Sequence, residues 1–494
     1  MSNTKAKFTT GSTMRHVVVM TVTSSAGLLS LFLVDAVNLL YISMLGVTEL
    51  AAAIGFAGTI QFFLISVSIG LLIAGSAMIS RAIGAGEHER ARELAGSSAA
   101  TAFVLMGIIA AFLWVFREDA LKLLGAKGEA LEKASLFLSI ALPSVPLIGI
   151  GMACSGTLRA MGEARQAMYV TLGGGLVAAV LDPILIFGFD LGLVGAALAM
   201  ALTRLWIAAS GLWLVVHRHN MMARPTASAL LVNAKPYMMI AGPAMATQLS
   251  TPFGNAYLTT TVAEFGDSAV AGWAVVGRMT ALSFGGIFAL SGAVGPIIGQ
   301  NYGAKLWPRI RTTYRDGLIF AGIYVLTAWV VLALATPWIV DAFGLVGEGA
   351  QILSTFTTWA AWAFVFTGAL FTANSAFNNL GRPLWSTMFN WSRDAAVIPA
   401  LAFGFAAGIG PTGAVWVQAI AAICVGSVAA VVGWRTVNRI AQREVQPSDV
   451  VSVPTPAFSS GRVVLGLTPD VGRTRSGSSA EGDQAPLASE EKNR

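Results

Sequence analysis

The chain has 494 residues, of which 55% are hydrophobic and only 11% charged, and its formal net charge is +6. A soluble chain would carry about 25% charged residues, so a soluble globular protein is excluded. The apolar residues form long runs, and about 20 of them suffice to cross a bilayer. We therefore predict an all-α polytopic membrane protein. Its basic residues fit a membrane topology better than binding of nucleic acid or another acidic partner.

Twelve apolar runs are long enough to be membrane spans. In chain order they are residues 17–46, 49–80, 94–116, 134–157, 166–189, 191–216, 236–262, 268–298, 316–338, 352–377, 385–408 and 412–434. We divide them into an N-lobe (17–216), a linker (217–235) and a C-lobe (236–434), preceded by a polar N-terminus (1–16). Residues 442–494 are rich in Ser, Gly, Pro and charge without a hydrophobic period, which predicts a disordered tail.

Basic residues alternate between the two sides of this topology. The N-terminus, the even-numbered loops and the C-terminus carry most of the Lys and Arg, whereas the odd-numbered loops have them only in the third loop, at Arg117, Lys122, Lys127 and Lys133. Because loops rich in Lys and Arg stay in the cytoplasm, both termini are expected there.

The two halves of the chain resemble each other at an offset of about 219 residues. The segment "RAIGAGEHERAR" from Arg81 matches "QNYGAKLWPRIR" from Gln300. Three further pairs match in the same order: "LGVTELAA" from Leu45 with "FGDSAVAG" from Phe265, "MGEAR" from Met161 with "LGRPL" from Leu380, and "PILIFGF" from Pro183 with "PALAFGF" from Pro399. Each half holds an even number of spans, which predicts two parallel repeats with a substrate cavity between them.

Two carboxylates, Asp35 and Asp182, stand inside apolar runs of the N-lobe, where each costs about 2.5–3.5 kcal/mol. Their repeat positions in the C-lobe hold Asn255 and Ile398, so the acids are present in one half only. Two nearby carboxylates in a medium of low dielectric constant do not both ionise easily. Together with Asn38, one helical turn from Asp35, they predict a coupling site for H+ or Na+. The alternative is that each acid pairs with a buried Arg or caps a backbone defect.

Other charges within the spans are assigned a structural or a substrate-cavity role. Arg278 lies in the eighth span, and Arg393 and Asp394 lie in the eleventh; we expect Arg278 and Asp394 to form a buried pair. Asn255 is a further candidate for the cavity. Arg204, in the sixth span, is expected to extend toward the cytoplasmic surface. No metal-ligand spacing, nucleotide-binding motif or catalytic His is found, so no cofactor is expected and no metal beyond Na+ at Asp35 and Asp182.

These residues lie in motifs that resemble the multidrug and toxic compound extrusion (MATE) family over residues 15–440. The motifs are "LVDAVNLLYISMLGVTELAAAIG" from Leu33, "SRAIGAGEHERAREL" from Ser80, "LRAMGEARQAM" from Leu158, "LDPILIFGFDLGLVGAALAMALTR" from Leu181, "GPIIGQNYGA" from Gly295 and "NNLGRPLWS" from Asn378. The resemblance implies two six-helix lobes around a V-shaped central cavity, in which Asp35 matches the first-helix acid and Asp182 that of the DinF-like branch. Two departures are Ala178, where the family often has Asn, and Thr23, where it often has Pro.

We therefore expect a secondary active exporter of amphipathic, cationic organic compounds, driven by antiport of protons or Na+. It is expected to be a monomer in a bacterial cytoplasmic membrane. A lipid-linked oligosaccharide flippase of the same superfamily is the first alternative, and an intramembrane enzyme is the second. The sequence does not identify the substrate, the coupling ion or the role of the tail.

Overall fold

The structure is a computed structural model that describes residues 6–43, 48–403 and 407–442. Within these ranges, the side chains of residues 30–40, 42–43, 48–49, 51 and 407 lie outside the description. The chain divides into two units, Met1–Asp449 and Val450–Arg494, and every described residue belongs to the first. Apart from Gln442, the predicted tail therefore lies outside the described residues.

All regular elements in the described residues of the first half are helices. Its elements are η1 (Lys7–Thr9), α1 (Thr13–Ser43), α2 (Thr48–Gly84), α3 (His88–Val115), α4 (Arg117–Leu123), α5 (Gly128–Ala141), η2 (Leu142–Ser144), α6 (Val145–Ala160), α7 (Ala164–Pro183), η3 (Ile184–Gly188), α8 (Gly192–Trp213) and η4 (Leu214–Arg218). Pro143 lies at the start of the 3-10 turn η2, which interrupts the fourth span. The elements η3 and η4 are π-helices at the ends of the fifth and sixth spans.

The second half repeats this order. Its elements are α9 (Ala227–Ala263), α10 (Asp267–Gly303), α11 (Trp307–Ala342), α12 (Gly347–Thr355), η5 (Phe356–Ala360), η6 (Ala361–Ala363), α13 (Phe364–Asn379), α14 (Pro383–Trp391), η7 (Ser392–Val397), α15 (Ile398–Leu401), α16 (Ala407–Ile409), η9 (Gly410–Thr412) and α17 (Gly413–Gln442). The tenth span consists of α12 to α13 and the eleventh of α14 to α15, each interrupted by a π-helix.

The predicted membrane fold is confirmed. Among the described residues, nine helical segments are long and apolar enough to cross a membrane. The other three predicted spans correspond to α1, α9 with its internal prolines, and the interrupted segment α14 to α15. Several helices exceed the predicted spans; α9 starts at Ala227, where the Thr226 hydroxyl caps it by accepting from the Ala229 amide. Hydropathy detects only the apolar part of a helix, not the polar turns beyond it.

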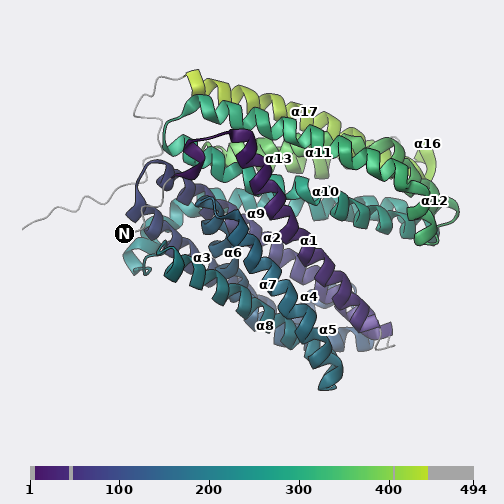
Figure 1. The fold of residues 1–494 in the computed structure, drawn as a ribbon. Coiled ribbons are helices and arrows are strands. Elements are labelled where there is room, and N and C mark those ends of the chain that lie inside the picture. Colours follow the sequence, from purple (N-terminus) through teal and green to yellow (C-terminus); the bar gives the residue numbers. More distant parts are fainter. Residues whose placement is uncertain (1–5, 44–47, 404–406, 443–494) are drawn as a thin grey trace, which may run out of the picture. The chain divides into compact units, whose positions relative to one another are not determined.

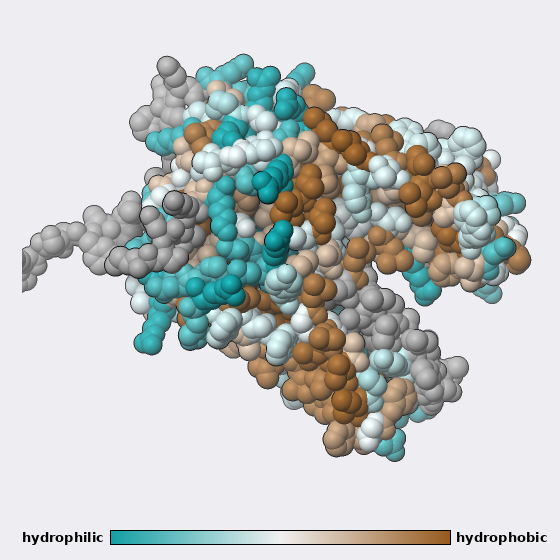
Figure 2. All heavy atoms as spheres, in the orientation of Figure 1, coloured by the Kyte–Doolittle hydropathy of each residue, from teal (hydrophilic) through white to brown (hydrophobic). Residues whose placement is uncertain are grey.

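The helices of the two halves come together at one end and diverge toward the other (Figure 1). The end where they meet holds the start of α1 and carries most of the hydrophilic surface in this view (Figure 2). Across the halves, α1 packs against α10 and α11, and α2 packs against α9 and α10. We call the end of the molecule where the two halves meet the joined end.

The contacts at the joined end follow the sequence repeat. Arg81 Nε donates to the carbonyl oxygen of Asn379 over 3.0 Å, and Gln300 Nε2 donates to the carbonyl oxygen of Ala160 over 2.7 Å. Arg81 and Gln300 are equivalent in the repeat, and so are Ala160 and Asn379. The same hydrogen bond is therefore made twice, once in each direction, as a pseudo-twofold relation between the halves requires.

Two glycines let the halves approach so closely. A Cβ atom at Gly84 would lie 2.0 Å from the Gln300 carbonyl oxygen, and one at Gly303 would lie 2.0 Å from the Arg81 carbonyl oxygen. Gly84 and Gly303 are also equivalent in the repeat. Any side chain at either position would force the helices apart, because small residues permit such close backbone packing.

The segment before α1 joins both halves at this end. The Phe8 amide donates to Gln300 Oε1 over 2.9 Å, and the Phe8 carbonyl accepts from Arg309 Nη2 over 2.8 Å. Lys7 forms an ion pair with Glu163, which belongs to the first half. Phe8 is only 3% exposed, so the main chain and the ring of this residue are both held between the halves.

Candidate functional site

The predicted coupling site lies in the first half, on two helices that pack together. The backbone of Asp35 and Asn38 belongs to α1, but their side chains lie outside the described residues. α1 packs against α7, which ends at Asp182–Pro183. Tyr41 of α1 meets Phe187 of η3 edge to face, with ring centroids 6.1 Å apart. The helices that carry the two predicted acids are thus neighbours.

Asp182 is a buried acid at an irregular point of its span. Its exposure is 1%, and it lies one residue before Pro183, after which the chain forms the π-helix η3. A proline lacks the amide that a regular helix uses, and π-turns occur frequently at functional sites. The α-helical hydrogen-bond pattern therefore ends at Pro183 and continues as this π-turn. Ala178, one turn earlier, is also buried.

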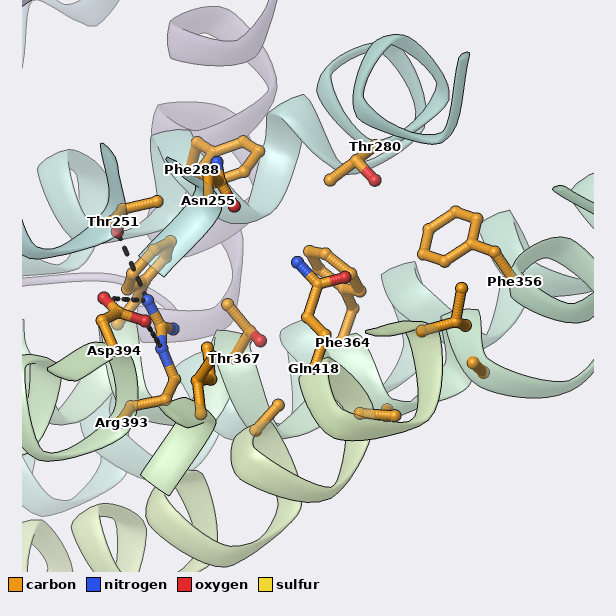
Figure 3. Close-up of a pocket in the computed structure, with 17 residues that line it drawn as sticks. Thr251, Asn255, Thr280, Phe288, Phe356, Phe364, Thr367, Arg393, Asp394 and Gln418 are labelled. Carbon is orange, nitrogen blue, oxygen red and sulfur yellow. Dashed lines mark hydrogen bonds and ion pairs between the residues drawn. The ribbon is translucent and has the colours of Figure 1, made fainter. Parts of the chain in front are cut away.

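The second half has a pocket at the positions equivalent to the predicted coupling site (Figure 3). Its cavity volume is about 80 Å³, and it lies between α9, α10, η5, α13, η7 and α17. Asn255 and Ile398, the repeat counterparts of Asp35 and Asp182, both line it. The C-lobe thus keeps a cavity at this place but has an amide and an apolar side chain where the N-lobe has acids. We call it the C-lobe pocket.

An ion pair between sequence neighbours forms one end of the C-lobe pocket. Arg393 Nε and Nη2 donate to the two oxygens of Asp394 over 2.7 and 2.9 Å, and Nη2 also donates to Thr251 Oγ1 over 3.3 Å. The expected Arg278–Asp394 pair is therefore wrong, since Arg393 occupies both carboxylate oxygens and Arg278 is exposed. Arg393 and Asp394 are 7% and 2% exposed, respectively.

A kink in α10 forms another wall of the C-lobe pocket. Phe284 has φ −111° and ψ 15°, and it lies between the pocket residues Thr280 and Phe288. The Tyr324 hydroxyl enters the helix at this point, donating to the Ser283 carbonyl oxygen and accepting from the Gly286 amide. A side chain inserted into the helical hydrogen-bond ladder is a recognised cause of kinks. Its counterpart α2 is continuous.

Arg204 contradicts the expectation that it extends toward the membrane surface. It is 7% exposed and donates to Ala141 O and Ser144 Oγ, each over 2.8 Å, and to Gln61 Oε1 over 2.6 Å. These acceptors come from three other elements, so the guanidinium joins the helices of the N-lobe. Neutral oxygens accept all three of these bonds.

Sequence reasoning missed most of the C-lobe pocket. Phe288, Phe364 and Gln418 are not distinguishable in sequence from ordinary residues of apolar helices. One available signal was positional, because the repeat counterparts of the acids, Asn255 and Ile398, are part of its lining. Mapping the two acids onto the second half through the repeat could therefore have located the C-lobe pocket.

Comparison with known proteins matches this architecture. The MatE family profile matches twice, over residues 24–184 and 243–399, once in each half. The chain is 27% identical to a FAD transporter of Shewanella oneidensis over 376 residues, covering 74% of this chain and 82% of that protein. It is 26% identical to the multidrug export protein MepA of Staphylococcus haemolyticus over 398 residues, with coverages of 78% and 85%.

Solved structures show the same fold. A MATE transporter of Vibrio cholerae, VcmN, superposes with a TM-score of 0.81 at 27% identity, covering 87% of this chain and 99% of that one. An outward-facing multidrug resistance MATE transporter superposes with a TM-score of 0.82 at 21% identity, covering 89% and 99%. The two lobes, the duplicated match and these neighbours lead to one conclusion: the chain belongs to the MATE family of membrane transporters.

Proposed function

We propose that this protein is a secondary active exporter of amphipathic organic compounds, with Asp35 and Asp182 as the carboxylates that bind the coupling H+ or Na+. It acts as a monomer in a bacterial cytoplasmic membrane, with both termini in the cytoplasm. The observation that supports this most is the burial of Asp182 beside Pro183 and η3 in an apolar span, with Ile398 at the equivalent position of the other half.

A buried carboxylate suits ion exchange because its charged form is destabilised by the apolar surroundings. Binding a proton or Na+ neutralises it, so the ion and a cationic substrate group compete for the same charge. Each elementary charge that moves inward releases about 2.3 kcal/mol per 100 mV of membrane potential, equivalent to an approximately 50-fold substrate gradient. The inward flow of the ion thereby drives the outward flow of substrate.

The similar proteins suggest a broad substrate class. One is named for FAD and another for multidrug export, and both descriptions fit amphipathic organic molecules. Our proposal for this chain is the cationic members of that class, because the N-lobe has acids at positions where the C-lobe has Asn255 and Ile398, and a carboxylate attracts positive charge. A lipid-linked oligosaccharide flippase is less favoured, because Arg393 is already paired with Asp394 and Arg278 does not line the C-lobe pocket.

The test is export from proteoliposomes under a proton gradient or a Na+ gradient, imposed separately. Asp182→Asn and Asp35→Asn imitate the neutralised state and should lower gradient-driven export of a cationic dye by about 5- to 150-fold, the usual range of coupling free energies. Asp190→Asn is the matched control, since Asp190 is an exposed acid of the same lobe. If both site variants transport like the parent under both gradients, the proposed coupling site is wrong.

A further inference from the structure

The C-lobe pocket has a polar lining with unused hydrogen-bonding capacity. Arg393 uses Nε and Nη2, but its Nη1 group has no hydrogen-bond partner among the described residues. The same holds for the side-chain amides of Asn255 and Gln418. In Figure 3 the Gln418 amide points into the space between Thr280 and Thr367. An apolar pocket with a few convergent polar groups is the usual form of a small-molecule binding site.

The rest of the lining is aromatic. Phe288 and Phe364 face this space, and Phe356 closes the far end (Figure 3). Phe364 is held by stacking on Phe284, with centroids 4.4 Å apart and an interplanar angle of 8°. Fixed aromatic rings favour a flat aromatic ligand, since ring pairs gain energy beyond that of buried area alone.

The charges of the pocket exclude the class of ligand proposed for the N-lobe. Asp394 is the only acid among the described lining residues, and a bidentate pair with Arg393 neutralises it. The two positions equivalent to the N-lobe acids hold Asn255 and Ile398. An organic cation therefore finds no free negative charge here, and the guanidinium Nη1 presents hydrogen atoms that attract a ligand oxygen instead.

Three irregular helical segments build this pocket. They are the kink of α10 at Phe284, the π-helix η5 that carries Phe356, and the π-helix η7 that carries Arg393 and Asp394. Such irregularities cost backbone energy and are frequent at functional sites. The N-lobe has no such break in α2, the counterpart of α10. The C-lobe pocket is therefore shaped separately from the N-lobe site.

We propose that the C-lobe pocket is a second binding site, specific for a flat, uncharged aromatic molecule that carries a carbonyl oxygen. The oxygen accepts from Arg393 Nη1, the ring lies against Phe288 and Phe364, and the amides of Asn255 and Gln418 bind its polar edge. This inference goes beyond the proposed antiport, because binding here requires neither the N-lobe acids nor an ion gradient.

The experiment compares two fluorescent tricyclic probes of the same shape on the full-length protein in lipid nanodiscs. Acridone is neutral and has a carbonyl group, whereas 10-methylacridinium is a cation without one. We expect acridone to bind at least tenfold more tightly at this pocket, the effect of about one hydrogen bond to a charged donor. Ala419→Trp fills the pocket and should abolish acridone binding.

Two milder variants keep the test decisive if Ala419→Trp does not fold. Phe288→Ala removes one ring and Gln418→Leu one amide, and each should weaken acridone binding several-fold. The paired change Arg393→Met with Asp394→Leu, which leaves no lone charge, should weaken acridone binding about tenfold and leave 10-methylacridinium unchanged. Arg278→Gln, an exposed arginine of the same lobe, is the control and should have no effect.

Asp182→Asn separates this inference from the proposed function. It should reduce gradient-driven export and leave acridone binding unchanged. The inference is overturned if acridone does not bind the parent, if Asp182→Asn abolishes its binding, if the pocket variants bind it like the parent, or if 10-methylacridinium binds this pocket as tightly.

Discussion

The two lobes bury ionisable groups within their spans in opposite ways. The N-lobe buries Asp182 and Arg204, and neutral oxygens and the Met200 sulfur accept the described hydrogen bonds of Arg204. The C-lobe buries Arg393 and Asp394 as neighbours that neutralise each other. A duplicated fold therefore does not imply duplicated electrostatics: neutral groups bind the buried Arg204 of one lobe, and a carboxylate pairs with the buried Arg393 of the other.

The largest effect should come from breaking the C-lobe pair. Arg393→Met leaves the Asp394 carboxylate buried without its cation, which should lower the free energy of unfolding by about 3–5 kcal/mol. Unfolding in mixed micelles of rising SDS content measures this. Arg278→Met, in the same lobe but exposed, should unfold like the parent. A loss of less than about 1 kcal/mol, the usual value for an exposed pair, would show that the pair is not sealed from water.

The corresponding change in the N-lobe should cost less. Arg204→Met removes a charge whose described partners Ala141, Ser144 and Gln61 are neutral, so the acceptors lose hydrogen bonds but no carboxylate is left alone. We expect a loss of about 1–3 kcal/mol in the same unfolding assay. The exposed Arg218→Met serves as its control. A loss equal to that of Arg393→Met would contradict the contrast between the lobes.

The close contacts at Gly84 and Gly303 test the pseudo-twofold relation between the halves directly. Gly84→Ala and Gly303→Ala each place a Cβ atom against a carbonyl oxygen of the other half and should destabilise the protein by about 1–3 kcal/mol, equally within error. Gly277→Ala is the matched control in α10, because no atom lies within 4 Å of a Cβ there. The stability of each variant is measured by thermal unfolding of the purified protein. Unequal losses of stability for the two variants would mean that the two glycine contacts are not equivalent.

A smaller effect is expected at the kink that only the C-lobe has. Tyr324→Phe removes the hydroxyl that bonds Ser283 and Gly286, at a cost of about 0.5–1.5 kcal/mol for a lost hydrogen bond. It should also weaken acridone binding, since the wall of the pocket moves. Tyr169→Phe, at an exposed position of the N-lobe, should change neither stability nor binding. Unchanged acridone binding by Tyr324→Phe would separate the kink from the pocket.

The smallest effect concerns the polar edge of the N-lobe. Burial lowers the pKa of His219 below its ordinary value of 6.5, and Arg218 and Lys7 lower it further against the opposing charge of Glu163. The folded protein then binds a proton less readily than the unfolded chain. Stability from this group is full above pH 6.5 and declines as the pH falls below it. Unfolding of His219→Gln should lose this slope, whereas the exposed His217→Gln should keep it.

The sequence predicts the spans and the repeat well, because hydropathy and internal homology are properties of the chain itself. It does not predict that Arg393 pairs with Asp394. Adjacent residues on a regular helix do not face each other, so helical spacing alone does not predict that the Arg393 side chain reaches Asp394 within η7. Hydropathy likewise places Arg204 inside the sixth span, but it does not show which side of that helix packs against the other helices of the lobe. Irregular turns and helix rotation depend on tertiary packing.

Because Phe8 is buried between the halves, the residues before α1 can report whether the joined end is closed or open. Any motion that separates the halves at the joined end must withdraw a buried ring and break main-chain hydrogen bonds to Gln300 and Arg309. A dye attached near the first residues should therefore gain mobility when that end opens, giving a spectroscopic signal of alternation without a label in the transport path.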